Sequence, residues 1–149
     1  MIIRLQTSLG HDLPNWQDSE VTIPDQNQAA EYPGLFPEAQ FFLDSLSAVY
    51  NCFGLTFASR RTKLDEKHIE MILHDDRYEA VPIAETRPGD LILYRKDGEV
   101  THAGFVVKVT MGLPWIWSKW GNGPEAIHRY FDVKSDVYGI DHKFYRCKL

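Results

Sequence analysis

Short apolar segments separated by tight turns fill residues 91–131, and they constrain the fold of this chain more than any other feature. Leu91–Tyr94 is predicted as a buried strand, and Arg95–Glu99 after it contains the Asp-Gly pair typical of hairpin turns. Further strands are predicted at Thr101–Val109, Trp115–Trp120, Ala126–Phe131 and Phe144–Cys147. Consecutive strands joined by such short loops must pair antiparallel, so the pattern predicts an antiparallel meander.

Helical spacing dominates the residues before the meander. Asp65–Asp76 has its apolar side chains on one side and its charges on the other, as an amphipathic helix does. Apolar offsets predict a second helix over about 52–60, ended by two arginines, and the run from Glu38 to Leu46 also has some helical spacing. Helices followed by a meander indicate an α+β fold in which N-terminal helices pack on a five- or six-stranded antiparallel sheet.

Residues 1–37 are rich in proline and polar residues, which favours short extended pieces joined by turns, with a weak helical turn at Asp25–Tyr32. We expect this extension to wrap around the rest of the chain. The 149 residues are enough for one domain that buries a sizeable core. A single domain over residues 1–149 is therefore predicted.

Charge and hydropathy exclude several functional classes. The net charge of −5 gives no electrostatic support for binding nucleic acid or an anionic membrane surface. No apolar run approaches the length of a membrane span, and the N-terminus has no secretory signal pattern. A cytoplasmic protein is expected, unless an exporter that reads no N-terminal signal delivers it elsewhere. No pattern calls for a cofactor or a metal.

Cys52 is the first candidate for chemistry. It is one of two cysteines, with Cys147, and two cysteines do not make a disulfide framework. At the first turn of the predicted 52–60 helix, the helix dipole and free backbone N–H groups would favour the thiolate, which is a nucleophile. The alternative is a small buried hydrophobic residue, the usual role of a free cysteine.

His102 is the best placed base for that thiol. It begins a predicted strand directly after the hairpin turn and precedes two small residues, Ala103 and Gly104, which leave room for a helix or a substrate. A sheet packed on the Cys52 helix would bring the imidazole within reach of the sulfur. The alternative is an ordinary histidine at the edge of a sheet.

Three motifs in order and spacing resemble those of the NlpC-type and CHAP-type papain-fold cysteine hydrolases. They are Asn51-Cys52-Phe53-Gly54-Leu55 at a helix start, Pro88-Gly89-Asp90 before a strand, and Thr101-His102-Ala103-Gly104 on the next strand. The resemblance covers roughly residues 48–130. It implies a papain-like fold and a covalent acyl-enzyme mechanism on peptide or amide bonds, often those of cell-wall peptides, without a cofactor.

The same resemblance assigns roles to individual residues. Cys52 would be the nucleophile and His102 the base, while the backbone N–H of Cys52 would form an oxyanion hole with a donor just upstream, either Asn51 or Tyr50. The implied partner is a peptide or amide substrate, with a peptidoglycan-derived peptide as one candidate. An immunity protein is a further candidate partner if the chain is an effector or toxin.

The third catalytic residue of these families orients the histidine, and here the sequence departs from their pattern. A hairpin centred near Met111–Gly112 would pair His102 with about Gly121 and leave Ser118 and Lys119 close to it. We select His128 on the next strand, because an imidazole there could accept a hydrogen bond from His102. Ser118, Lys119 and Asn122 stay open as alternatives, as does a structural His128 bonded to backbone.

Two other functions fit the same residues. An acyltransferase or a transglutaminase-type enzyme would use the thiol in the same way but pass the acyl group to an amine. A binding or immunity module would keep the papain-like fold without its chemistry. The sequence favours the hydrolase because both Cys52 and His102 are present. It specifies neither the substrate nor the oligomeric state, and it leaves a cytoplasmic enzyme, a phage-type lysis protein and an effector equally open.

Overall fold

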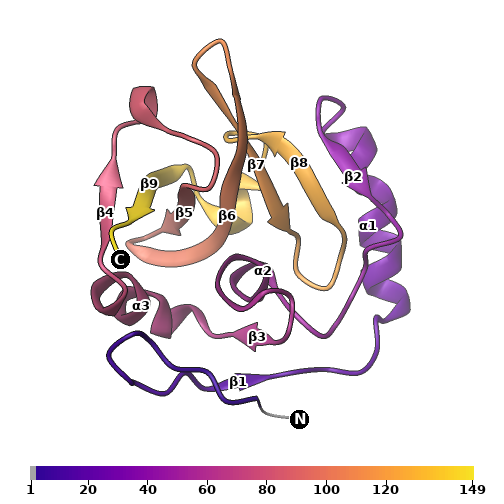
Figure 1. Cartoon of the computed structure of the whole chain (residues 1–149). Coiled ribbons are helices and arrows are strands. Elements are labelled where there is room, and N and C mark those ends of the chain that lie inside the picture. Colours follow the sequence, from indigo (N-terminus) through magenta and orange to yellow (C-terminus); the bar gives the residue numbers. More distant parts are fainter. Residues whose placement is uncertain (1–2) are drawn as a thin grey trace.

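A seven-stranded sheet organises the chain in the computed structural model, which describes residues 3–149 (Figure 1). The strand order is β2-β8-β7-β6-β5-β9-β4, and all neighbouring strands run antiparallel. The strands are β2 (Gln40–Phe42), β4 (Tyr78–Val81), β5 (Leu91–Lys96), β6 (Glu99–Thr110), β7 (Leu113–Lys119), β8 (Glu125–Arg129) and β9 (Asp141–Cys147). The α+β class is confirmed, with more strands than the five or six expected.

The additional strands are the two short edges of the sheet. β4 has four residues and β2 has three, which is too few for an alternating pattern to be recognised in the sequence. The helical spacing expected over Glu38–Leu46 is wrong for β2. Its Phe41 pairs with Ala126 of β8 and stacks on Tyr32, so tertiary contacts override the local preference.

Within residues 3–149, four helices and two 3-10 turns accompany the sheet. They are α1 (Ile23–Leu35), α2 (Cys52–Ala58), η1 (Glu66–His68), α3 (Ile69–Asp75), η2 (Ile83–Glu85) and α4 (Ser135–Tyr138). The predicted 65–76 helix is thus confirmed as η1 with α3, and the 52–60 helix as a shorter α2. The weak helical turn expected at Asp25–Tyr32 lies within a longer helix, α1.

A capping box explains why α1 is longer than expected. The Thr22 side chain accepts a hydrogen bond from the backbone N–H of Asp25, and the Asp25 carboxylate accepts one from the N–H of Thr22. Pro24 lies in the first turn, where its missing N–H costs nothing. Pro33, which reads as a helix breaker, lies only two residues before the helix ends at Leu35.

The chain before α1 lies along the side of the molecule that carries α2 and α3 (Figure 1). There β1 (Asn15–Trp16) pairs antiparallel with β3 (Lys63–Leu64). The Thr7 hydroxyl donates to Asp75 at the end of α3 over 2.6 Å. These contacts attach the N-terminal segment to the helices rather than to the sheet.

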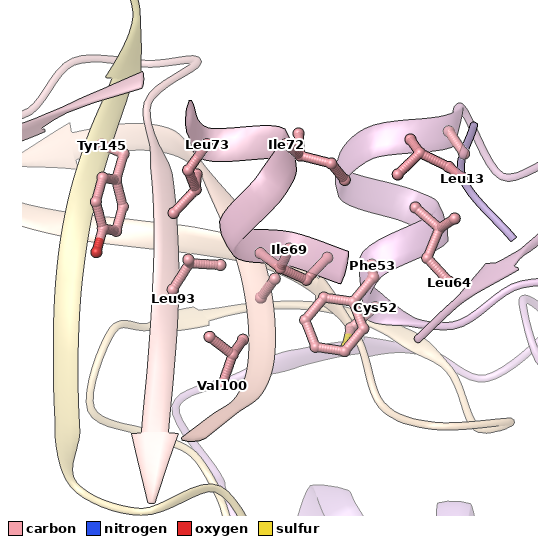
Figure 2. Close-up of a cluster of buried hydrophobic side chains, with 12 residues drawn as sticks. Leu13, Cys52, Phe53, Leu64, Ile69, Ile72, Leu73, Leu93, Val100 and Tyr145 are labelled. Carbon is pink, nitrogen blue, oxygen red and sulfur yellow. The ribbon is translucent and has the colours of Figure 1, made fainter. Parts of the chain in front are cut away.

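The two faces of the central strands contribute to different parts of the core. On one face, Leu93 and Ala103 pack in a cluster with residues of α2 and α3, including Cys52, Phe53 and Ile69 (Figure 2). On the other face, apolar side chains of β5, β6, β7 and β9 form a second cluster, with Val133 from the chain after β8. Because side chains alternate along a strand, neighbouring residues of β6 belong to opposite faces.

Candidate active site

Cys52 begins α2, as predicted. The Asn51 side chain caps this helix by accepting a hydrogen bond from the backbone N–H of Gly54 over 2.9 Å. The helix packs against β6 and β7 (Figure 1), and the thiol lies in the cluster of Figure 2 with a side-chain exposure of only 7%. In this conformation Cys52 is therefore a buried residue in the first turn of a helix.

Burial decides the protonation state of this thiol. It raises the pKa of Cys52 to about 12, although the backbone N–H groups of Ala103, Phe53 and Cys52 itself, and then the Lys119 cation, act in the opposite direction. The thiolate expected from the helix dipole is thus not the resting form. At neutral pH the sulfur carries its proton.

The His102 imidazole lies on β6 and is 1% exposed. Its ring stacks on Tyr138, with centroids 4.1 Å apart and planes inclined by 15°, and it also contacts Tyr94. Its Nε2 is buried and has no hydrogen-bond partner. Burial lowers the pKa of His102 to about 3, with a smaller contribution from His128, so the ring is neutral at pH 7. A buried imidazole nitrogen without a partner costs free energy and is unusual in a native core.

Cys52 packs against β6 from one face of the sheet, whereas the side chain of His102, a residue of β6, points to the other face. Ala103 belongs to the cluster that contains Cys52, so the preceding residue, His102, points to the face of Tyr94 and Tyr138. Pairing between β6 and β7 begins only at Gly104 and Ser118. The helix α2 packs against both of these strands.

The β6–β7 register differs from the expected one because of a bulge between Val106 and Lys108. The bulge shifts the pairing by one residue and places Gly104 opposite Ser118. Gly104 is required at this point, since a Cβ there would lie 2.6 Å from Cγ2 of Ile116. Gly104 therefore allows the two strands to pack closely.

His128 does not act as a third residue beside His102 in this structure. Its Nε2 lies 2.7 Å from Oγ of Ser118 and its Nδ1 lies 2.7 Å from the carbonyl oxygen of Arg129. Burial lowers the pKa of His128 to about 4. Both nitrogens are engaged away from Nε2 of His102, which agrees with the structural alternative rather than with the selected role.

The two oxyanion-hole candidates are also engaged elsewhere. The Asn51 amide donates to the carbonyl of Leu64 over 2.8 Å, while its oxygen accepts from Gly54. The Tyr50 hydroxyl donates to the buried carboxylate of Glu125. The remaining candidate donor is the backbone N–H of Cys52, which, in the first turn of a helix, has no partner within that helix.

Lys119, one of the alternatives for the third residue, is completely buried. Its ammonium donates to the carbonyls of Ser47 (2.9 Å), Gly121 (2.9 Å) and Gly123 (2.7 Å), and it lies 4.9 Å from the centre of the Tyr50 ring. These bonds use all three donors of the ammonium group. Lys119 thereby joins the segment before α2 to the loop between β7 and β8.

The remaining alternative, Asn122, donates to the carboxylate of Asp25 at 3.3 Å. None of the four candidates thus satisfies Nε2 of His102. Among residues 3–149, no group of three or more histidine, cysteine, aspartate or glutamate side chains is placed to hold a metal ion. Both cysteines are free thiols, with Cys147 exposed.

Sequence reasoning missed the importance of Tyr138, whose ring covers the His102 imidazole. It also missed the buried carboxylate of Glu125, which binds Tyr50, Trp117 and Arg60 beside the start of α2. Comparison with protein-family models, curated proteins and solved structures gave no match. None of the helices in the described part of the chain is long and apolar enough to cross a membrane.

Proposed function

We propose that this chain is a papain-like cysteine hydrolase of peptide or amide bonds, with Cys52 as the nucleophile and His102 as the base. The observation that supports it most is the buried, unpartnered Nε2 of His102 on the strand against which the Cys52 helix packs. A structural histidine would have its nitrogens satisfied, as His128 has. A base awaiting a proton needs a free nitrogen.

The reaction would follow the usual acyl-enzyme sequence. His102 takes the proton of the Cys52 thiol as the sulfur attacks the carbonyl carbon of the substrate, and the oxyanion is bound by the backbone N–H of Cys52. The imidazolium then returns its proton to the leaving amine as the carbon–nitrogen bond breaks. Water, deprotonated by His102, hydrolyses the thioester and releases the carboxylic acid and the free thiol.

The buried conformation is the resting form of the proposed enzyme. Burial is the largest cause of both the raised pKa of Cys52 and the lowered pKa of His102. Admission of water between α2 and the sheet would reduce both effects, because each arises from desolvation of a charged form. Opening the site would therefore bring the two pKa values closer together and favour proton transfer from sulfur to imidazole.

The test measures covalent modification of the Cys52 thiol as well as cleavage of peptide substrates. Cys147→Ser serves as the parent protein, so that Cys52 is the only cysteine. We expect a covalent acetyl adduct on Cys52, seen by intact mass after p-nitrophenyl acetate, and release of new amines from a mixture of short peptides and muropeptides. Cys52→Ala should form no adduct, and His102→Ala should slow its formation. Adduct formation that is equal with and without His102, together with no cleavage of any peptide, would reject the hydrolase.

Two alternatives have their own signatures in the same experiment. Transfer of the acyl group to an added amine such as hydroxylamine, in preference to water, would indicate an acyltransferase. The inactive binding or immunity module is favoured by one observation, the close stacking of Tyr138 on the proposed base. It predicts that Cys52 stays unreactive toward iodoacetamide between pH 5 and 8 and that His102→Ala changes nothing.

A further inference from the structure

A pocket of about 250 Å³ lies next to the proposed site, between α1, the loop after β7 and α4. Its walls include the aromatic rings of Tyr32, Trp120 and Tyr138, the polar side chains of Asp25 and Asn122, and the ammonium-bearing side chain of Lys134. Neither Cys52 nor His102 lines it. Its volume is enough for a short segment of peptide but not for a large cofactor.

The Tyr138 ring separates this pocket from the proposed base. Tyr138 lines the pocket and also stacks directly on the imidazole of His102. Trp120, another wall of the pocket, meets the Tyr138 ring edge-on at 6.5 Å. Removal of this ring would join the pocket to the face of the imidazole.

The segment that carries Tyr138 is anchored at its C-terminal end by two close contacts, and nearer its N-terminal end by the Lys96 ammonium, which donates to the carbonyl of Asp136. The Thr101 hydroxyl donates to the carbonyl of Tyr138 over 2.6 Å, and a Cβ at Gly139 would lie 2.2 Å from the carbonyl oxygen of Arg95. Gly139 also has a φ of 82°, which favours glycine. At the other end, α4 is a single turn without a side-chain cap, and its Val137 is 49% exposed. Such a segment opens at low cost compared with the rest of the fold.

The charges at the pocket favour a carboxylate ligand. The Lys134 ammonium forms no ion pair within residues 3–149, and the nearest ring is Tyr32, whose centre is 5.9 Å away. The Asp25 carboxylate is already bound by the N–H of Thr22 and by the Asn122 amide. The free cation beside aromatic walls is thus the group that would select among ligands.

We propose that this pocket receives a carboxylate-bearing segment of the peptide substrate, and that the Tyr138 ring is the gate between the pocket and the proposed site, on the side of His102. The inference rests on the proposed function, because it names the approach to that same site. It identifies Tyr138 as a gating residue and Lys134 as the residue that selects a carboxylate. Neither takes part in bond making or breaking.

Alkylation of Cys52 tests the gate without requiring turnover. In the Cys147→Ser parent, we expect Tyr138→Ala to raise the iodoacetamide rate constant by about tenfold or more, since a buried thiol becomes accessible. Tyr138→Phe keeps the ring and should stay within about a factor of two of the parent. Equal acceleration in both variants, or in neither, would overturn the gate. Because only thiol access is measured, this result is independent of whether any peptide is cleaved.

A second pair of measurements separates the pocket from general loosening of the fold. Asn122→Trp fills the pocket, so in the Tyr138→Ala background it should return the alkylation rate toward the parent value. If it has no effect, iodoacetamide reaches Cys52 by another route and the pocket is not the approach. Trialanine, with its free carboxylate, should slow alkylation of Tyr138→Ala more than trialanine amide does. Lys134→Gln should abolish that difference, and equal protection by both peptides would reject the selection of a carboxylate.

Discussion

Oγ of Ser118 lies 2.7 Å from Nε2 of His128, and this contact fixes the role of the second buried histidine. Nδ1 of His128 faces the carbonyl of Arg129 and must carry the proton, so Nε2 accepts from the Ser118 hydroxyl. Oγ of Ser118 accepts in turn from Nε1 of Trp120 over 3.0 Å. The chain of hydrogen bonds is complete with a neutral imidazole and contains no link to His102.

His128→Gln should therefore destabilise the fold without altering the proposed chemistry. Loss of the imidazole leaves buried partners at Ser118 and Arg129 unsatisfied, and we expect the free energy of unfolding to fall by about 1 to 3 kcal/mol. Urea denaturation measures that change. The pH profile of Cys52 alkylation in the same variant should match that of the parent. A displaced profile would show that His128 does act on the site.

Stability should decrease as the pH is lowered from about 6.5 toward 5. His102 and His128 have folded pKa values of about 3 and about 4, below the ordinary value of 6.5, because both rings are buried. In this range the unfolded chain binds protons that the folded chain does not, so each histidine costs up to about 1.4 kcal/mol per pH unit. Urea denaturation at several pH values measures the slope. His128→Gln should roughly halve it, and a flat stability over this range would contradict the neutral buried state of both rings.

Lys119 should hold two loops together. Its ammonium bonds to Ser47 on one side and to Gly121 and Gly123 on the other. We expect Lys119→Met to increase hydrogen exchange in residues 44–51 and 120–124 together, because the same three bonds order both segments. Lys108→Met is the matched control, since Lys108 is exposed and its ammonium lies 4.7 Å from the centre of the Trp115 ring. Faster exchange in only one of the two loops would reject this role of Lys119.

The sequence was most informative where side-chain periodicity is strict. The meander from β5 to β8 and the position of Cys52 on its helix were predictable, because both depend on local patterns. The bulge between Val106 and Lys108 was not, since it arises from packing against the neighbouring strand. The stacking of Tyr138 on His102 was equally hidden, because the two residues are distant in sequence and α4 is a single turn.

The tryptophans of the predicted 115–120 strand show the same limit. Alternation in the sequence places Trp115 and Trp117 on one face and favours core packing for this pair, whereas Trp120 and the loop after it are expected to border the active cleft. In the structure Trp120 is 1% exposed, whereas Trp115 and Trp117 are only partly buried. Trp120 follows the last residue of β7 and is enclosed by the aromatic rings of Tyr32, Phe36 and Phe41 from α1, its C-cap and β2. The sequence predicted only a weak turn within α1 and did not predict β2, so the burial of Trp120 by these elements could not be predicted either.

The contribution of the Glu125 carboxylate to stability should be lost in acid. Although burial alone would raise its pKa, hydrogen bonds from Arg60, Tyr50 and Trp117 lower it to about 2. Its contribution is therefore present above the unfolded value of 4.5 and is lost as the pH falls toward 2. Glu125→Gln weakens the bonds that this buried carboxylate accepts from Tyr50, Trp117 and the half-exposed Arg60, and it should lower the free energy of unfolding at pH 7 by about 1 to 3 kcal/mol.

Urea denaturation at pH 7 and pH 3 measures this effect. The difference between Glu125→Gln and the parent should be smaller at pH 3, where the parent has begun to lose the contribution of the carboxylate. Glu79→Gln on β4 is the control, because Glu79 is exposed and should change stability by no more than about 0.5 kcal/mol. An equal effect of the two substitutions would contradict the buried role of Glu125.

Gly54 should tolerate no side chain, in contrast to a glycine of α1. A Cβ at Gly54 would lie 1.8 Å from the carbonyl oxygen of Thr62, so α2 approaches the chain before β3 too closely for alanine. Gly54→Ala must displace α2 and with it the thiol of Cys52, and we expect a loss of about 3 kcal/mol or more. Gly34 also lies in a helix, but nothing lies within 4 Å of its Cβ position. Gly34→Ala should instead stabilise the fold by about 0.5 to 1 kcal/mol. Urea denaturation measures the expected loss of stability in Gly54→Ala and the expected gain in Gly34→Ala. Equal effects of the two substitutions would show that the close contact between α2 and Thr62 does not form.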